Sequence, residues 1–182
     1  REGLIQIVTN MVTNFTGFAP LGIVVVTMIG IGVAENSGLI SALMKKTVLS
    51  APKKLILPVI IFTGLVGTVA ADAAFIILPP IAAMIFMSVG RNPLVGLIAT
   101  YAAIAGGFSA NIIISSLDVL LLGITQTAAQ LVDPTYTGLA TMNYYFMIVS
   151  TFLIVIVASW VTVKFVEPRF GKYEGKVEKL EK

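Results

Sequence analysis

The chain has 182 residues, of which 57% are apolar and 12% charged, and its mean hydropathy is +0.98. Average soluble domains are about half apolar and about a quarter charged, so this composition indicates an integral membrane protein. The absence of cysteine and histidine excludes a disulfide framework, a thiolate metal site and a histidine-based triad within this chain, and a net charge of +3 without a basic stripe gives no support to nucleic-acid binding.

The first predicted element is an interrupted helix over residues 3–36. An amphipathic stretch, 3–14, is separated from an apolar helix, 20–34, by the sequence NFTGFAP. We expect the apolar helix to end with Gly38 as its C-terminal cap. The chain opens without a methionine and without a charged region before a short apolar core, so we interpret it as a fragment or a processed piece rather than as a chain with a signal peptide.

Residues 54–90 are predicted to form a helical hairpin. Lysines precede the segment and Arg91 follows it, and loops rich in basic residues face the cytoplasm, so both ends are expected on that side. A single helix over 55–90 would be about 54 Å long, too long for a hydrocarbon core of about 30 Å. The glycines and polar residues within 64–74 provide the break. A re-entrant hairpin and two short full crossings both remain open.

Residues 93–131 are predicted to form a broken helix that crosses the membrane an odd number of times. The loop after it, near 132–141, carries an aspartate and no base, unlike the loop before it. The interruption is GGFSAN, because each glycine weakens a helix by about 1 kcal/mol relative to alanine and serine and asparagine compete for backbone hydrogen bonds. We therefore expect helices over 93–105 and 110–131 with an unwound link between them.

The last predicted element is a transmembrane helix over residues 142–167 that returns to the cytoplasm. Aromatic rings favour the membrane interfaces, and they lie at both ends of this helix, with Tyr144 near the outer end and Trp160 near the inner end. Residues 168–182 carry alternating charges and are expected to form a solvated cytoplasmic tail or a connector.

Asp72 and Asp118 are the acidic residues placed well inside apolar segments. A central aspartate costs about 2.5–3.5 kcal/mol on insertion scales, so such a residue usually faces a bundle interior or an aqueous cavity. The functional interpretation is ion or proton coupling, or contact with a substrate. The alternative is a structural hydrogen bond to a neighbouring helix, or a position nearer the membrane interface.

A polar stripe accompanies Asp118. Asn111, Ser115, Asp118 and Thr125 are spaced so that they share one face of a continuous helix. Unwound backbone at the preceding break frees amides and carbonyls, which the broken helices of transporters use to hold ions and substrates. The alternative is that these side chains bond to their own helix or hold neighbouring helices together.

Three stretches of the sequence, 14–44, 106–130 and 142–162, resemble the AbgT family of bacterial p-aminobenzoyl-glutamate transporters, some of which are similar to exporters of sulfonamides. The resemblance spans nearly the whole chain, and the second stretch is the most specific. It implies an all-α integral membrane fold with a hairpin and a broken helix, one half of an inverted-repeat transporter. It also implies a multi-pass homodimer in the bacterial inner membrane that needs a second repeat to complete its site.

The resemblance also assigns site residues. Asp118 matches the family's acid after the GG(F/Y)SAN block, where that acid is implicated in transport, and the block itself contributes Gly107, Ser109 and Asn111. Related carriers have a Ser-Asn-Thr run at the first hairpin tip. Here the tip reads GTVAAD, which departs from that pattern and leaves the residues of any sodium site unassigned. The candidate site residues are Asp118, Asn111, Ser109, Gly107, Ser115, Asp72 and Thr68.

The leading hypothesis is a secondary transporter subunit for p-aminobenzoyl-glutamate or related aromatic acids, or an antiporter that exports sulfonamide antimetabolites and so confers antibiotic resistance. Coupling to protons or sodium would run through Asp118, and no cofactor is expected. The alternative is a non-transporting membrane scaffold or partner-binding subunit. An enzyme is not expected, because no nucleophile–base pair or metal-ligand cluster has workable spacing. The direction of transport, the coupling ion and the exact substrate stay open.

Overall fold

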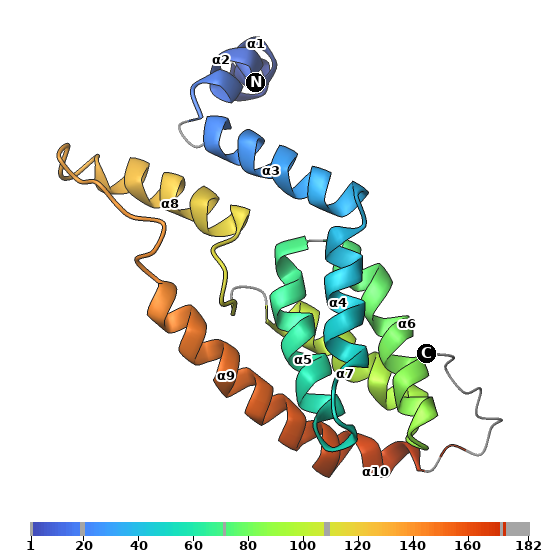
Figure 1. The fold of residues 1–182 in the computed structure, drawn as a ribbon. Helices are drawn as coiled ribbons and strands as arrows, with labels where there is room; N and C mark the ends of the chain where they lie inside the picture. The colour runs from blue at the N-terminus through green and yellow to red at the C-terminus, as the bar shows by residue number, and fades with distance from the viewer. Residues whose placement is uncertain (1, 19–20, 71, 108–109, 172, 174–182) are drawn as a thin grey trace. The chain divides into compact units, whose positions relative to one another are not determined.

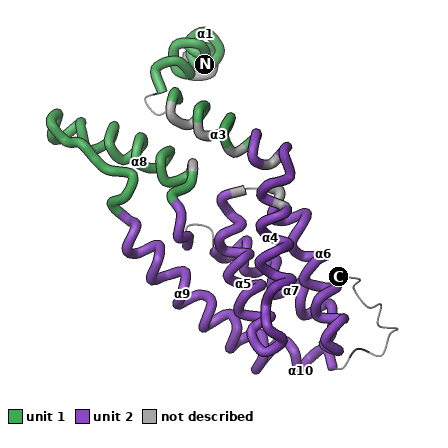
Figure 2. Tube along the Cα trace, in the orientation of Figure 1, with its two compact units in different colours: residues 1–32, 114–142 green, residues 33–113, 143–182 purple. Residues whose placement is uncertain are grey.

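A computed structural model describes residues 2–18, 21–70, 72–107, 110–171 and 173 (Figure 1). Every regular element within these ranges is helical, which confirms the predicted all-α class. The chain divides into two compact units (Figure 2). The first unit combines residues 1–32 with 114–142, and the second combines 33–113 with 143–182.

The first unit contains the helices at the front of the chain and the helix after the predicted break. Its elements are α1 (Glu2–Thr9), α2 (Met11–Thr16), most of α3 (Leu21–Asn36) and α8 (Ser116–Ala129). Beyond α8, the Gln130 side chain donates to the Tyr136 carbonyl at 3.0 Å. The Thr135 hydroxyl and amide both donate to the Asp133 carboxylate, at 2.6 and 3.0 Å, and these two hydrogen bonds lower the pKa of Asp133. Side chains therefore fix the polar loop predicted near 132–141.

Gly38 lies two residues after the end of α3 and directly before α4, with φ of +75°, a left-handed conformation that glycine adopts without strain. The second unit then contains α4 (Leu39–Leu49), a 3₁₀ turn (Lys53–Leu55), α5 (Ile56–Gly67), a second 3₁₀ turn (Thr68–Ala70), α6 (Asp72–Ser88), α7 (Pro93–Gly106), α9 (Tyr144–Val161), a π-helical turn (Thr162–Val166) and α10 (Glu167–Phe170). The helix α6 continues through its two adjacent prolines.

One continuous helical run among the described residues, 144–170, is long and apolar enough to cross a membrane by itself. It joins α9, the π-helical turn and α10, so it ends beyond the predicted boundary at residue 167. A second candidate span arises if Ala42–Leu49 and Lys53–Gly67 are taken together, although they are bent by 114° at the break between them. The other apolar helices are shorter.

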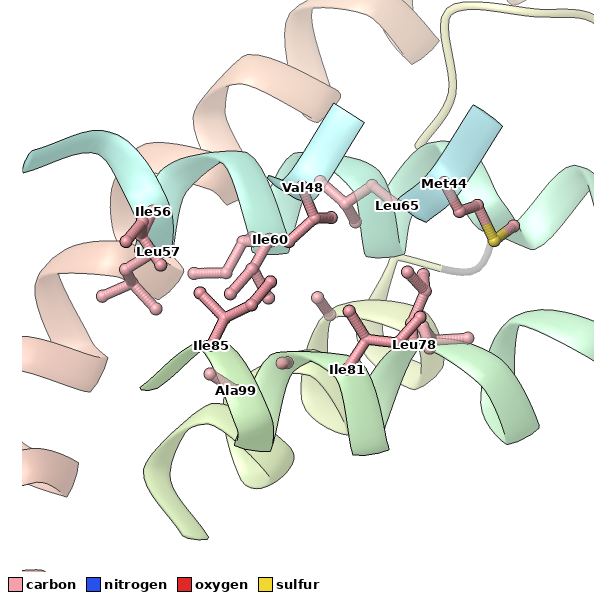
Figure 3. Packing of buried hydrophobic residues seen from close by; sticks show 14 of the residues in the cluster. Met44, Val48, Ile56, Leu57, Ile60, Leu65, Leu78, Ile81, Ile85 and Ala99 are labelled. Carbon is pink, nitrogen blue, oxygen red and sulfur yellow. The ribbon is translucent and has the colours of Figure 1, made fainter. Parts of the chain in front are cut away.

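The core of the second unit lies between α4, α5, α6 and α7 (Figure 3). The helix α5 is apolar on all sides, as expected for a helix surrounded by protein, and its Ile60, Ile61 and Leu65 are at most 1% exposed. Met44 and Val48 of α4, Leu78 and Ile81 of α6, and Val95 and Ala99 of α7 also belong to this core. The two predicted hairpin legs therefore share a core with α4 and α7.

Two glycines allow α7 to approach the hairpin legs closely. A Cβ added to Gly96 would lie 2.7 Å from the Ala82 carbonyl oxygen and 2.9 Å from the Phe86 ring, both on α6. A Cβ added to Gly64, on α5, would lie 3.1 Å from Ala103 Cβ. Small residues are typical of helix contacts in membranes, where close packing provides much of the attraction.

Polar contacts join the α6–α7 loop to the end of the last helix. The Arg91 guanidinium forms two hydrogen bonds of 2.7 Å to the Glu167 carboxylate and lies 4.4 Å from the centre of the Phe86 ring. Asn92 caps α7 by accepting from the Leu94 amide, and its amide group donates to the Phe170 carbonyl at 3.0 Å. The sequence predicted that this loop and the end of the last helix face the same side of the membrane, and their contact agrees with that prediction.

Candidate substrate site at the hairpin tip

In the non-helical segment before α8, one side chain takes over two backbone amides. The Asn111 side chain is 3% exposed, and its carbonyl oxygen accepts from the amides of Ile112 and Ile113 at 2.8 and 3.2 Å. These two amides are thereby turned away from the carbonyls that a helix would offer them. Gly107 and residues 110–115 are not helical, so α7 ends one residue later and the next helix begins six residues later than predicted; residues 108–109 of the predicted link lie outside the description.

This unwound segment contacts the hairpin tip directly. The Asn111 amide group donates to the Thr68 hydroxyl at 3.4 Å, although the two residues are 43 positions apart. The Thr68 hydroxyl donates in turn to the Leu65 carbonyl at the end of α5, at 2.6 Å. The structure therefore brings together two of the predicted site residues, one from the hairpin tip and one from the break.

Gly107 makes this approach sterically feasible. The residue is buried directly after α7, and its amide donates to the Ala103 carbonyl at 2.9 Å. A Cβ here would overlap the Leu65 side chain and lie 2.7 Å from the Ala103 carbonyl oxygen. Gly107 therefore acts through its lack of a side chain, which lets the link pass close to the end of α5.

Tyr144 belongs to the same network, which the sequence did not predict. Its hydroxyl donates to the Ile112 carbonyl at 3.1 Å, so the first residue of α9 holds the unwound segment. From the sequence the ring was assigned only to the membrane interface. No local sequence pattern links two residues that are 32 positions apart, so the sequence alone does not predict this contact.

An apolar pocket of about 210 Å³ borders the hairpin tip. Its lining comes from α4, α5, the 3₁₀ turn after α5 and the unwound segment, through Ile40, Leu43, Met44, Thr47, Phe62, Thr63, Val66, Gly67, Val69 and Ile113. The hydroxyls of Thr47 and Thr63 already donate to carbonyls of their own helices, each at 2.8 Å. The pocket is therefore suited to an uncharged group such as an aromatic ring.

The predicted polar stripe through Asp118 is wrong. The helix α8 begins at Ser116 rather than at residue 110, so Asn111 and Ser115 do not continue its face. The cause is local, because Asp118 Oδ2 accepts from the Ser115 amide at 2.7 Å and from the Ser115 hydroxyl at 2.8 Å. An acidic residue at the third helical position that bonds back in this way fixes the start of a helix. Thr125 is exposed further along α8.

The remaining predicted site residues are only partly described. Asp72 is the first residue of α6, and its side chain lies outside the description; Ser109 also lies outside the described residues. Asp118 and Ser115 belong to the first unit, whereas Asn111 and Thr68 belong to the second. Within the described ranges, no three acidic residues lie close enough together to hold a metal ion.

Comparison with known proteins identifies the family. The family model described as "AbgT putative transporter family" matches residues 1–182. The p-aminobenzoyl-glutamate transport protein of Escherichia coli K12 is 39% identical over 174 residues, which make up 96% of this chain and 34% of that protein. The crystal structure of the Alcanivorax borkumensis YdaH transporter is 38% identical, with a TM-score of 0.85 over 97% of this chain and 38% of that one.

The chain therefore spans about a third of the length of the relatives that it matches. The match to the family model confirms the resemblance carried by the three sequence stretches. These relatives are transport proteins rather than enzymes, in agreement with the absence of catalytic motifs. The chain belongs to the AbgT family and is part of a membrane protein.

Proposed function

We propose that this chain forms part of a multi-pass secondary transporter of the bacterial inner membrane, which moves p-aminobenzoyl-glutamate or a related aromatic acid. The observation that carries the proposal is the hydrogen bond between Asn111 and Thr68, which joins an unwound segment to a hairpin tip. The similarity to the p-aminobenzoyl-glutamate transport protein of Escherichia coli supports the substrate class. In this proposal the transporter is a homodimer, and a second repeat completes the site.

The length of the first hairpin leg supports a tip that lies at membrane depth. The 12 residues of α5 extend only about 18 Å at 1.5 Å per residue, whereas the hydrocarbon core is about 30 Å thick. Non-helical backbone at that depth is tolerated where protein buries it or where it lines a wet cavity. The near-complete burial of Asn111 fits this requirement and favours a re-entrant hairpin.

The apolar pocket supports an aromatic substrate. A p-aminobenzoyl group is a flat ring that suits an apolar lining, and two residues of that lining, Gly67 and Val69, flank Thr68 at the hairpin tip. Sulfonamides carry the same aminophenyl ring, so the proposal extends to their export. Everted vesicles and right-side-out vesicles, loaded with either compound, distinguish import from export.

Asp118 is the proposed coupling residue, for protons or for sodium. Its carboxylate accepts two hydrogen bonds through a single oxygen atom at the start of α8. A proton or a sodium ion on this group would compete with the Ser115 donors, so ion binding would change how α8 begins. An ion-dependent change at this helix start would link ion binding to the conformation of the broken helix.

Asp118→Ala is expected to reduce the initial rate of p-aminobenzoyl-glutamate uptake about tenfold or more, since hydrogen bonds to a charged group contribute about 1.5–3 kcal/mol. The measurement uses a full-length transporter that carries this chain, reconstituted in proteoliposomes and assayed over a series of pH values and sodium concentrations. Asp133→Asn, which alters an exposed acid of the same unit, is the matched control. Wild-type rates for Asp118→Ala across the whole series would remove the coupling role.

One observation favours the alternative of a scaffold. Asp118 accepts both of its hydrogen bonds from Ser115, at the start of its own helix. This capping role alone would explain an acidic residue at this position. In that case Asp118→Asn lowers the thermal unfolding temperature in detergent and leaves the flux per folded molecule unchanged. Parallel measurement of unfolding and flux therefore separates the two functions.

A further inference from the structure

We infer that Tyr144 is a positioning residue, which holds the unwound segment after α7 in the conformation that presents it to the hairpin tip. This inference rests on the proposed transport function. Its basis is the 3.1 Å hydrogen bond from the Tyr144 hydroxyl to the Ile112 carbonyl. All the residues concerned, Thr68, Asn111, Ile112 and Tyr144, belong to the second compact unit.

The peptide groups on both sides of Ile112 are held by different elements. Its amide donates to Asn111 within the segment, and Asn111 in turn contacts Thr68 at the hairpin tip. Its carbonyl accepts from Tyr144 on α9. The segment is therefore fixed from the hairpin on one side and from the last helix on the other, and Ile113, the next residue, lines the apolar pocket.

The helix that carries the donor is anchored by buried residues. Tyr144 is the first residue of α9; Met147, one turn further along, is 3% exposed, and Thr151, two turns further along, is fully buried. The Met147 carbonyl accepts from the Thr151 hydroxyl at 2.8 Å, so these buried polar atoms are paired within the helix. The helix α9 packs against α5, which carries the hairpin tip. The hydroxyl is therefore preorganised relative to the tip before any substrate binds.

Removing the hydroxyl leaves the Ile112 carbonyl without this donor in a part-buried setting. An acceptor that loses its partner away from water is costly, so the segment is expected to rotate in search of another partner. Rotation would displace Ile113 from the pocket wall and weaken the contact between Asn111 and Thr68. Substrate affinity is then the property that changes first.

The test compares Tyr144→Phe with Tyr145→Phe in a full-length transporter. Tyr145 is the adjacent residue on α9 and is 83% exposed, so its variant is a matched loss of one hydroxyl. For Tyr144→Phe we expect the half-saturating concentration of p-aminobenzoyl-glutamate to rise about tenfold, with a maximal rate per folded molecule close to wild type. For Tyr145→Phe we expect both values to stay near wild type.

A merely structural role predicts the opposite pattern, in which Tyr144→Phe lowers the yield and the maximal rate and leaves the half-saturating concentration unchanged. That outcome, or equal behaviour of the two variants, overturns the inference. Amide hydrogen exchange over residues 110–115 decides the matter without substrate. Exchange that is faster in Tyr144→Phe and not in Tyr145→Phe supports the inference. If the wild type does not transport p-aminobenzoyl-glutamate but this exchange difference is present, only the proposed function fails. Unchanged exchange in Tyr144→Phe contradicts the inference.

Discussion

Gly96→Leu is expected to lower the free energy of unfolding by about 3 kcal/mol, at the upper end of typical overpacking costs. Even a Cβ at this position would lie 2.7 Å from the backbone oxygen of Ala82 and 2.9 Å from the Phe86 ring. A backbone oxygen within a helix cannot rotate away as a flexible side chain can. The leucine would therefore force α7 away from α6 and disturb the core of the second unit.

Gly106→Leu provides the matched control. Gly106 is the last residue of the same helix α7, and nothing lies within 4 Å of a Cβ placed there. Leucine favours helix over glycine by several tenths of a kcal/mol, so this variant should be neutral or slightly stabilising. Thermal unfolding in a mild detergent measures both. Equal unfolding temperatures for the two variants would show that α6 and α7 do not pack closely at Gly96.

Arg91→Ala is expected to lower the free energy of unfolding by about 1–3 kcal/mol. Two parallel hydrogen bonds to Glu167, at 2.7 Å each, form the bidentate geometry in which arginine binds carboxylates most strongly. The Arg91 and Glu167 side chains are 25% and 29% exposed, so solvent screens the pair and the expected loss is smaller than for a fully buried pair. Loss of the contact with Phe86 adds to the effect.

A double-mutant cycle isolates this interaction. Arg91→Ala, Glu167→Ala and the double variant should show a coupling free energy of about 1 kcal/mol or more. Arg91→Lys keeps the charge and loses the second hydrogen bond, so it should recover only part of the stability. Lys54→Ala, at an exposed base, controls for net charge. Additive losses would mean that the pair does not hold the α6–α7 loop to the last helix.

The helices could be predicted because long uncharged segments, and the glycines and polar residues that interrupt them, can be recognised from residue types alone. The glycines and polar residues within 64–74 mark the hairpin tip, and GGFSAN marks the end of α7. The start of α8 differs from the prediction because a capping box at Ser115, rather than the spacing of polar residues, determines where this helix begins. The sequence SSLD, residues 115–118, already carries the serine and acid of a capping box, which is a local signal for a helix start.

The contacts of the candidate site were less accessible to prediction. Gly107, Thr68 and Asn111 were recognised by residue type and by the family resemblance, but their partners depend on the packing of α5 against α7. The bond from Tyr144 to the Ile112 carbonyl and the pair between Arg91 and Glu167 join residues 32 and 76 positions apart. Membrane topology predicts the side on which a loop lies and does not predict which side chain it meets.

The proposal that substrate binds at the hairpin tip is tested most directly by Asn111→Ala in a full-length transporter. The measurement is the affinity for p-aminobenzoyl-glutamate, determined by equilibrium binding to purified, folded protein. Asn143→Ala is the control, since Asn143 is exposed and its side chain does not cap α9. We expect an affinity at least about tenfold weaker for Asn111→Ala, because a buried amide that organises the hairpin tip is lost. We expect a wild-type affinity for the control. Wild-type affinity in a folded Asn111→Ala protein would contradict the claim that substrate binds where the hairpin tip meets the unwound segment.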